Sequence, residues 1–336
     1  MSDTTIDEAV LRVEALEIGL HRAKSVVPLV TGVDLAVSRR QVLGLVGESG
    51  SGKSLTSLAI ARLLDGRALR VTGGSVRLAG RDLLPLPESA MNAIRGNEIG
   101  VIFQDPMTSL DPAFTIGYQI ASVLRRHTDL RRQAAHQRAI ELLALVGIGD
   151  PARRVDQYAH QLSGGMRQRA MIAIAIACEP KLLIADEPTT ALDATTQAQI
   201  LELIKDLSQT LGMSTIITTH DLGVVADVCD TVAVMYAGQI VEQGPTEQIF
   251  YRPQHPYTER LLRSLPRVGV VEEIAGIPGT PPTAGRYPLG CRFAARCEFA
   301  IEPDCTTGPI NLEHLADAQC ARCVRVHNLA LRGVLS

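Results

Sequence analysis

Residues 47–54 read GESGSGKS and follow directly on the apolar run VLGLV at residues 42–46. These eight residues match the phosphate-binding pattern G-x-x-x-x-G-K-[ST]. A buried strand, a glycine-rich turn and the start of a helix aim several backbone N–H groups at one point, where the helix dipole also favours negative charge. The stretch therefore predicts a nucleotide site in which Lys53 reaches the β- and γ-phosphates and the Ser54 hydroxyl holds Mg²⁺.

Two carboxylates mark the end of a second apolar run, because residues 182–187 read LLIADE. At the end of a buried strand, Asp186 is placed to hold Mg²⁺, directly or through water, and Glu187 to polarise an attacking water. An acidic pair after an apolar run is more often a solvated loop. Because this pair lies downstream of a phosphate loop, the catalytic interpretation is favoured here.

Between these motifs, residues 162–169 read LSGGMRQR. Ser163 is a favourable helix N-cap, and Gly164 and Gly165 leave backbone donors open to a second anion. The following AMIAIAIA is apolar enough for a buried helix. The motif by itself therefore also fits an ordinary capped core helix.

Taken together, LSGGMRQR, GESGSGKS and LLIADEPTTALD resemble the ATP-binding subunit of an ABC transporter. Gln104 in VIFQDP resembles the glutamine loop of that family, Asp193 in ALD its D-loop, and His220 in TTHD its switch histidine. The resemblance implies catalytic roles for Glu187, His220 and Gln104. It implies that Ser54, Gln104 and Asp186 hold Mg²⁺. It implies that Ser163, Gly164 and Gly165 contact the nucleotide of a partner subunit. The residues that it implies for binding ATP in this chain are Gly47, Glu48, Ser49, Gly50, Ser51, Gly52, Lys53, Ser54, Thr56 and Asp186.

Three further stretches narrow the resemblance to the D-type ATPases of the dipeptide/oligopeptide importers. They are QDPMTSLDP after Gln104, FYRPQHPYTERLLRSLP at 250–266 and GCRFAARC at 290–297. The resemblance implies ATP-driven import of peptides, although related permeases carry nickel chelates, glutathione or other small solutes. The implied partners are a homologous F-type ATP-binding subunit in a heterodimer, two membrane permease subunits and an extracytoplasmic substrate-binding protein. The chain is then a peripheral protein on the cytoplasmic face of a bacterial cell membrane.

Composition is consistent with this interpretation. The chain has 336 residues, of which 46% are hydrophobic, and this is enough for one large α/β domain and an appendage. An aromatic fraction of 3%, no Trp and a net charge of −3 argue against a nucleic-acid partner. No apolar run approaches the ~20 residues that span a bilayer, and the polar, acidic N-terminal stretch does not resemble a signal peptide. We therefore expect a cytosolic protein that reaches the membrane through its partners.

Alternating patterns predict an α/β fold with an ABC-type phosphate-loop ATPase core, in which a mostly parallel sheet also has antiparallel strands. We expect strands at 11–19, 33–46, 75–79, 99–103, 182–185, 214–218 and 231–236, and helices at 55–64 and 196–211. The predicted ATP-binding domain covers residues 1–255, with an inserted helical subdomain at about 105–178. Residues 256–336 are predicted to form a small Cys-rich C-terminal domain, after a Pro- and Gly-rich linker at 276–290.

Five cysteines lie within residues 291–323, at positions 291, 297, 305, 320 and 323. Disulfides are the usual explanation for dense cysteines, but a cytosolic ATPase occupies a reducing compartment. Four thiolates can bind Zn²⁺ or an iron–sulfur cluster, and only Cys320 and Cys323 have the C-x₂-C spacing that zinc sites favour. The wider gaps resemble the tail of the family, which implies a [4Fe–4S] cluster on Cys291, Cys297, Cys305 and Cys323, with Cys320 as the alternative fourth ligand.

One feature departs from the family pattern. Members of the family usually have an aromatic residue near positions 20–27 that stacks on adenine, whereas this chain has Leu20, His21 and Val27 there. His21 offers an aromatic ring, but a loop histidine without that role is the favoured interpretation.

Two rival functions use the same loop. A soluble ABC ATPase of DNA repair or translation shares the three main motifs, but usually carries two cassettes, a long coiled coil or a zinc insertion, none of which the sequence indicates. A kinase or GTPase has no use for LSGGM. The importer ATPase is therefore the favoured interpretation.

Overall fold

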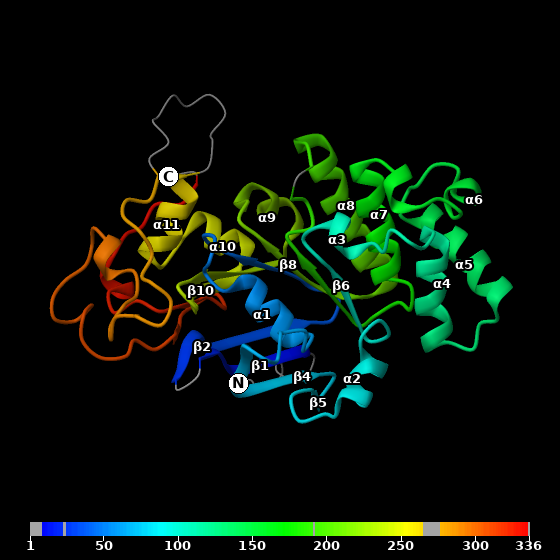
Figure 1. Ribbon diagram of the computed structural model, residues 1–336. Coiled ribbons are helices and arrows are strands. Elements are labelled where there is room, and N and C mark those ends of the chain that lie inside the picture. Colours follow the sequence, from blue (N-terminus) through cyan, green and yellow to red (C-terminus); the bar gives the residue numbers. More distant parts are fainter. Residues whose placement is uncertain (1–8, 23–24, 191, 265–275, 335–336) are drawn as a thin grey trace. The chain divides into compact units, whose positions relative to one another are not determined.

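The computed structural model describes residues 9–22, 25–190, 192–264 and 276–334. The contacts divide the chain into two compact units. The main segment of the first unit is Leu78–Thr218, and the second consists of Arg12–Ala36, Leu43–Arg77 and the chain from Thr219 onward. Figure 1 shows the ribbon and the element labels used below.

The first unit contains three parallel strands in the order β6-β7-β8, namely β6 (Ile99–Ile102), β7 (Leu182–Asp186) and β8 (Ser214–Thr219). All five residues of β7 are buried, so this strand has the continuous apolar character of a parallel sheet. The unit also contains the short strand β5 (Arg81–Asp82) and the 3₁₀ turn η1 (Ala159–Gln161). Its helices are α2 (Glu88–Ile94), α3 (Pro106–Ser109), α4 (Ile116–His127), α5 (Arg132–Leu145), α6 (Pro151–Arg154), α7 (Gly164–Ala175) and α8 (Ala194–Leu211).

Helices α3 to α7 occupy the stretch predicted to be helical, and their colours run from cyan at α3 to green at α7 in Figure 1. Helix α4 buries Ile116, Ile120 and Leu124 at a spacing of four residues, which places them on one face. Helices α4 and α5 pack against each other, and both contact α7. The helical character of 105–178 is thus confirmed, whereas its status as a separate subdomain stays a prediction.

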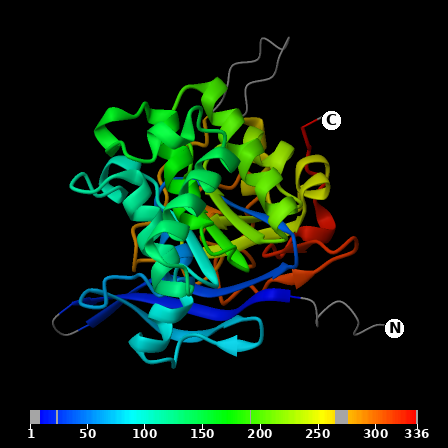
Figure 2. The same cartoon turned by 90° about the vertical axis from the view of Figure 1, so that its right-hand side faces the viewer.

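The second unit contains two sets of strands. One set has the order β2-β1-β4 and consists of β1 (Ala9–Arg22), β2 (Ser25–Ser38) and β4 (Leu69–Leu78), which Figure 2 shows as long blue and cyan strands. The other has β3 (Val42–Val46) parallel to β9 (Thr231–Tyr236), followed by three antiparallel neighbours, β10 (Gln239–Pro245), β12 (Cys320–Ala321) and β11 (Glu313–His314). The helices are α1 (Lys53–Ile60), α9 (Leu222–Val228), α10 (Thr246–Tyr251) and α11 (Pro256–Arg263), and the 3₁₀ turns are η2 (Ala294–Arg296) and η3 (Val326–Asn328).

Two sequence predictions are wrong at the N-terminal strands. Residues 33–46 do not form one strand, because β2 ends at Ser38 and β3 begins at Val42. Arg40 turns the chain with φ of 59°, and the Gln41 side chain accepts a hydrogen bond from the Ser38 N–H at 2.8 Å. Residues 38–41 read SRRQ, so a short polar run without glycine or proline is the sequence feature at this turn. His21 lies within β1 and not in a loop.

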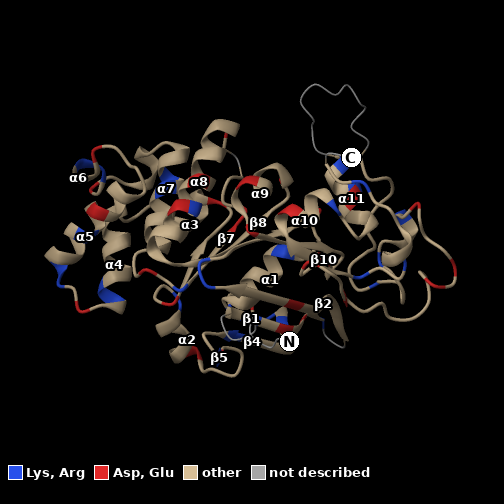
Figure 3. Cartoon of the chain, turned by 180° about the vertical axis from the view of Figure 1, so that it is seen from behind, with Lys and Arg blue, Asp and Glu red and all other residues tan. Residues whose placement is uncertain are grey.

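Positions of Lys and Arg and of Asp and Glu are interspersed along the described ribbon (Figure 3). Among the described residues, none of the helices combines the length and the apolar character needed to cross a membrane.

Candidate functional site

The phosphate loop leaves the end of the fully buried β3 and runs into α1 at Lys53. Gly47 has φ of 150°, and a Cβ atom there would lie 2.1 Å from the backbone oxygen of Met235. Gly50 and Gly52 have φ of 75° and 108°, which L side chains rarely adopt. The turn of the loop therefore depends on backbone geometry that favours glycine.

Two side chains inside the loop suit an anion. Lys53 is only 4% exposed, and its Nζ donates to the Gly47 oxygen at 2.8 Å and the Glu48 oxygen at 3.1 Å. The Ser51 hydroxyl is buried and, within the part of the chain that is described, has no hydrogen-bond partner. Thr56 donates to the Gly52 oxygen at 3.0 Å and so stabilises the first turn of α1. A buried ammonium and an unused hydroxyl in this glycine-rich loop fit nucleotide phosphates.

Glu48, the second residue of the loop, has two partners that sequence reasoning missed. The Tyr257 hydroxyl accepts the Glu48 N–H at 2.9 Å. The Arg296 guanidinium donates to Glu48 Oε2 at 2.8 Å and to Oε1 at 2.9 Å. Opposite charge was the one available signal for this ion pair, because 248 positions separate the two residues in sequence.

The predicted carboxylates lie together in the first unit. Asp186 is 8% exposed and accepts a hydrogen bond from the Thr218 hydroxyl. The Glu187 N–H donates to Thr218 Oγ1 at 3.0 Å, and Glu187 Oε2 accepts from Gln104 Nε2 at 2.9 Å and from Thr190 Oγ1 at 3.1 Å. Gln104 and Thr190 thus orient the Glu187 carboxylate, as a base for water requires.

The LSGGM and ALD motifs both begin helices in the same unit. Ser163 caps α7 and accepts from the Met166 N–H at 3.4 Å, and Ser163 and Gly164 are exposed. Asp193 caps α8 and accepts from the backbone and hydroxyl of Thr196 at 2.9 and 2.8 Å. The backbone hydrogen bond from Thr196 lowers the pKa of Asp193 below its usual value. A Cβ atom on Gly165 would lie 3.0 Å from Thr196, so the two helix starts are close.

His220 belongs to the second unit. It is exposed, and it stands between the end of β8 and Asp221, which caps α9 by accepting from the Gly223 N–H at 2.9 Å.

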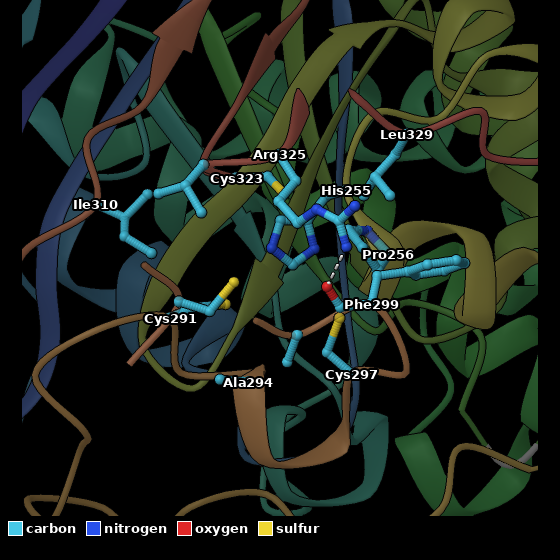
Figure 4. A pocket seen from close by; sticks show the side chains of 13 residues that line it. His255, Pro256, Cys291, Ala294, Cys297, Phe299, Ile310, Cys323, Arg325 and Leu329 are labelled. Atoms are coloured by element: carbon cyan, nitrogen blue, oxygen red, sulfur yellow. Dashed lines mark hydrogen bonds between the residues drawn. The ribbon is translucent and has the colours of Figure 1, made fainter. Parts of the chain in front are cut away.

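Four cysteines of the second unit line one pocket (Figure 4). They are Cys291, Cys297, Cys305 and Cys323, beside His255 and Phe299. Burial, and to a smaller extent the neighbouring thiols, raises the pKa of Cys291 to about 12 and that of Cys323 to about 11. Four thiols that line one pocket form a donor set that a cation would stabilise as thiolates.

Cys320 lies apart from this pocket lining, on β12. Its sulfur is 3.0 Å from His314 Nδ1. Within the described residues, all seven cysteines are free of disulfides, and no three His, Cys, Asp or Glu side chains converge as they would on a single metal ion.

Comparison with known proteins agrees with this geometry. Residues 30–190 match the family model for the ABC transporter, and residues 241–305 match that for the oligopeptide/dipeptide transporter, C-terminal region. The oligopeptide transport ATP-binding protein AppD of Bacillus subtilis is 48% identical over 93% of this chain and 95% of the relative. The chain belongs to the ATP-binding subunits of the oligopeptide/dipeptide ABC transporters.

Two further similarities support that assignment. Oligopeptide transport ATP-binding protein OppD of Bacillus subtilis is 52% identical over 88% of this chain and 83% of the relative. The ATP-binding cassette MJ0796, solved as a dimer in a post-hydrolysis state with ADP and Pi, has a TM-score of 0.63 and 25% identity over 70% of this chain and 98% of that cassette. The α/β ABC ATPase fold is therefore shown. The boundary at 255/256 and a separate Cys-rich domain stay predictions.

Proposed function

We propose that this ABC ATPase subunit binds Mg·ATP at its phosphate loop, hydrolyses it with Glu187 as the general base, and powers import of oligopeptides. The phosphate loop supports this proposal most directly. Its glycine-dependent backbone encloses the buried Lys53 ammonium and the Ser51 hydroxyl, which has no hydrogen-bond partner among the described residues. Within the oligopeptide ABC transporter family, that loop serves ATP-driven transport.

The residues divide the chemistry among themselves. Lys53 exchanges its bonds to the loop carbonyls for contacts to the β- and γ-phosphates. Ser54, Gln104 and Asp186 hold Mg²⁺, which neutralises charge on the phosphates when bound. Glu187 accepts the proton of the attacking water, while Gln104 and Thr190 orient its carboxylate. His220 contacts the γ-phosphate side of the same nucleotide.

A second ATP-binding subunit completes the site in this proposal. Ser163 and Gly164 are exposed at the N-terminus of α7, where open backbone donors suit the γ-phosphate of a nucleotide held by the partner. The partner is a homologous F-type subunit, and the pair closes when ATP is bound. Two permease subunits and an extracytoplasmic binding protein complete an importer, with this chain on the cytoplasmic face of the membrane.

Peptides are the cargo that similarity favours, because the match to the oligopeptide/dipeptide C-terminal region accompanies relatives described as oligopeptide transport proteins. Nickel chelates, glutathione and other small solutes are the alternative cargoes. Uptake of labelled peptides and of these solutes by the reconstituted transporter separates the two groups.

The hydrolysis step is tested in the assembled transporter with Glu187→Gln and Lys53→Ala. Glu187→Gln keeps the acceptor for Gln104 but removes the base, so turnover falls by orders of magnitude while ATP binding survives. Lys53→Ala loses ATP binding itself. Wild-type hydrolysis by the Glu187→Gln complex would refute the assignment of the base.

The two-subunit site is tested by concentration. The purified chain hydrolyses ATP slowly, and the F-type and permease subunits raise its rate. Ser163→Arg obstructs the site on the partner. Fast turnover of the lone chain that does not depend on its concentration contradicts the two-subunit site.

We also propose that Cys291, Cys297, Cys305 and Cys323 hold a [4Fe–4S] cluster with a structural role. Their thiols line one pocket, and Cys320 is next to His314 instead. Tetrahedral zinc requires all four sulfurs at about 2.3 Å from one point. These four cysteines share one pocket, and the resemblance of their spacing to the tail of the family favours the cluster over zinc.

Metal analysis tests the cluster directly. Anaerobically purified protein is expected to be brown and to contain iron and labile sulfide in equal amounts. Zinc at one equivalent in a colourless protein would replace the cluster by a zinc site.

A further inference from the structure

Arg296 donates two hydrogen bonds to the phosphate loop and three to residues outside it. Its Nε donates to the Pro278 oxygen at 2.8 Å. Nη1 donates to Glu48 Oε2 at 2.8 Å and to the Tyr236 hydroxyl at 3.1 Å, and Nη2 donates to Glu48 Oε1 at 2.9 Å and to the Ile277 oxygen at 3.2 Å. A guanidinium has five N–H groups, so every donor is used. The side chain is 5% exposed, and its pair with Glu48 is bidentate.

Glu48 is held through each of its polar groups. Its N–H donates to the Tyr257 hydroxyl, and its carbonyl accepts from Lys53 Nζ at 3.1 Å and from the Ser51 N–H at 3.1 Å. Its carboxylate forms an ion pair with the Arg296 guanidinium. The second residue of the phosphate loop therefore has little conformational freedom, and its carbonyl contacts restrain Lys53 and Ser51.

The same short stretch carries two of the pocket cysteines. Arg296 directly precedes Cys297, and the 3₁₀ turn Ala294–Arg296 joins it to Cys291 through the Ala294 N–H bond to the Cys291 oxygen at 3.0 Å. Phe293, in the middle, is 1% exposed and packs edge-on against the Tyr236 and Tyr257 rings with centroids 5.3 Å away. Anything that fixes Cys291 and Cys297 also fixes the position of Arg296.

We propose that Arg296 is a positioning residue that couples the four-cysteine pocket to the ATP phosphate loop through Glu48. Occupancy of the pocket holds the 291–297 turn, the turn holds Arg296, and Arg296 holds the loop in the conformation that accepts phosphates. The coupling to the pocket rests on the proposed metal centre, whereas the action of Arg296 on the loop does not. Affinity for nucleotide falls in proportion to the fraction of molecules whose loop is competent.

The first test is a double-mutant cycle on the full-length chain, with Mg·ATP affinity measured by fluorescent nucleotide titration. Arg296→Ala and Glu48→Ala each weaken binding about tenfold, and the double variant is no worse than either single variant, since both remove one interaction. Arg296→Lys keeps the positive charge but cannot form the bidentate pair with Glu48, so this variant loses only part of the affinity for Mg·ATP.

Arg322→Ala is the matched control. Arg322 is an arginine of the same C-terminal region that donates to the Ile240 and Ile310 oxygens. Its removal costs stability but leaves the nucleotide dissociation constant within twofold of wild type. Hydrogen exchange at residues 47–54 is faster in Arg296→Ala and unchanged in Arg322→Ala. A purely structural role for Arg296 lowers the folded fraction and leaves the affinity of that fraction intact, and this result, or additive effects in the cycle, overturns the proposal.

The second test uses Cys297→Ser, with metal content and nucleotide affinity measured on the same sample. The variant loses metal and binds Mg·ATP as weakly as Arg296→Ala, and combining the two changes adds nothing. Loss of metal with wild-type affinity overturns the coupling to the pocket. Absence of metal from the wild type refutes the proposed centre instead, and the cycle of Arg296 and Glu48 then decides their interaction independently.

Discussion

The phosphate loop and the cysteine pocket belong to the same unit and are constructed in opposite ways. The loop uses eight consecutive residues between a buried strand and a helix, and its shape depends on glycines with positive φ. The pocket collects four cysteines from residues 291–323, where the described elements are two-residue strands and 3₁₀ turns. Backbone geometry therefore defines the first site before any ligand binds. The second depends on packing and, in our proposal, on the metal it holds.

The largest effect is expected where backbone geometry is strictest. Gly47→Ala brings Cβ to 2.1 Å from a backbone oxygen, so the loop must deform and measurable ATP binding is lost. Gly50→Ala is the matched control, because its Cβ meets no atom within 4 Å, and only its φ of 75° is unfavourable by about 1–2 kcal/mol. Titration with Mg·ATP compares the two. Equal affinities would show that the close approach at Gly47 does not constrain the loop.

The cysteine pocket is probed by a matched pair of changes. Cys291→Ser removes a pocket thiol and is expected to bleach the protein and lower its Tm. Cys320→Ser alters a sulfur that lies next to His314 and leaves the metal content unchanged. Iron and sulfide analysis with a thermal melt checks both. Equal loss of metal in the two variants would place Cys320 among the ligands.

The difference between the phosphate loop and the cysteine pocket explains which features could be predicted from the sequence. Contiguous motifs in the ATP-binding region and the apolar strands β6, β7, β8 and β9 were predicted, because local periodicity and spacing encode them. The break between β2 and β3 was missed because Arg40 takes a positive φ that no glycine announces. Strands β11 and β12 were missed because each is only two residues long. The contact of Glu48 with Arg296 has no local signal at all.

A buried carboxyl beside the pocket gives a pH-dependent prediction. Glu242 on β10 is fully buried and accepts from the Gln254 and His255 N–H groups at 2.7 and 2.9 Å and from Gln319 Nε2 at 2.9 Å. Burial raises its pKa from 4.5 to about 7. Folding thus favours the protonated form, and this stabilisation is complete below pH 4.5 and is lost as pH rises through 7.

The shift of Glu242 amounts to about 3 kcal/mol between those limits, at 1.36 kcal/mol for each pKa unit. His255 stays neutral over the range, because burial lowers its pKa to about 3. Glu242→Gln is expected to flatten the fall in unfolding free energy between pH 5 and pH 8, measured by urea titration. An unchanged fall in the variant would assign the pH dependence to another group.

The smallest expected effect concerns the link between the aromatic cluster and the loop. Tyr257→Phe keeps the buried ring against Tyr236, 4.6 Å between centroids, but removes the acceptor of the Glu48 N–H. A lost hydrogen bond of this kind costs about 1 kcal/mol, so ATP affinity falls roughly fivefold, less than for Arg296→Ala. Tyr236→Phe is the control, because Arg296 loses one acceptor and retains its two bonds to Glu48. Its nucleotide affinity is expected to remain within twofold of wild type. If Tyr236→Phe weakens ATP binding more than Tyr257→Phe does, the conformation of the loop depends on the position of the Arg296 guanidinium and not on the hydrogen bond of the Glu48 N–H.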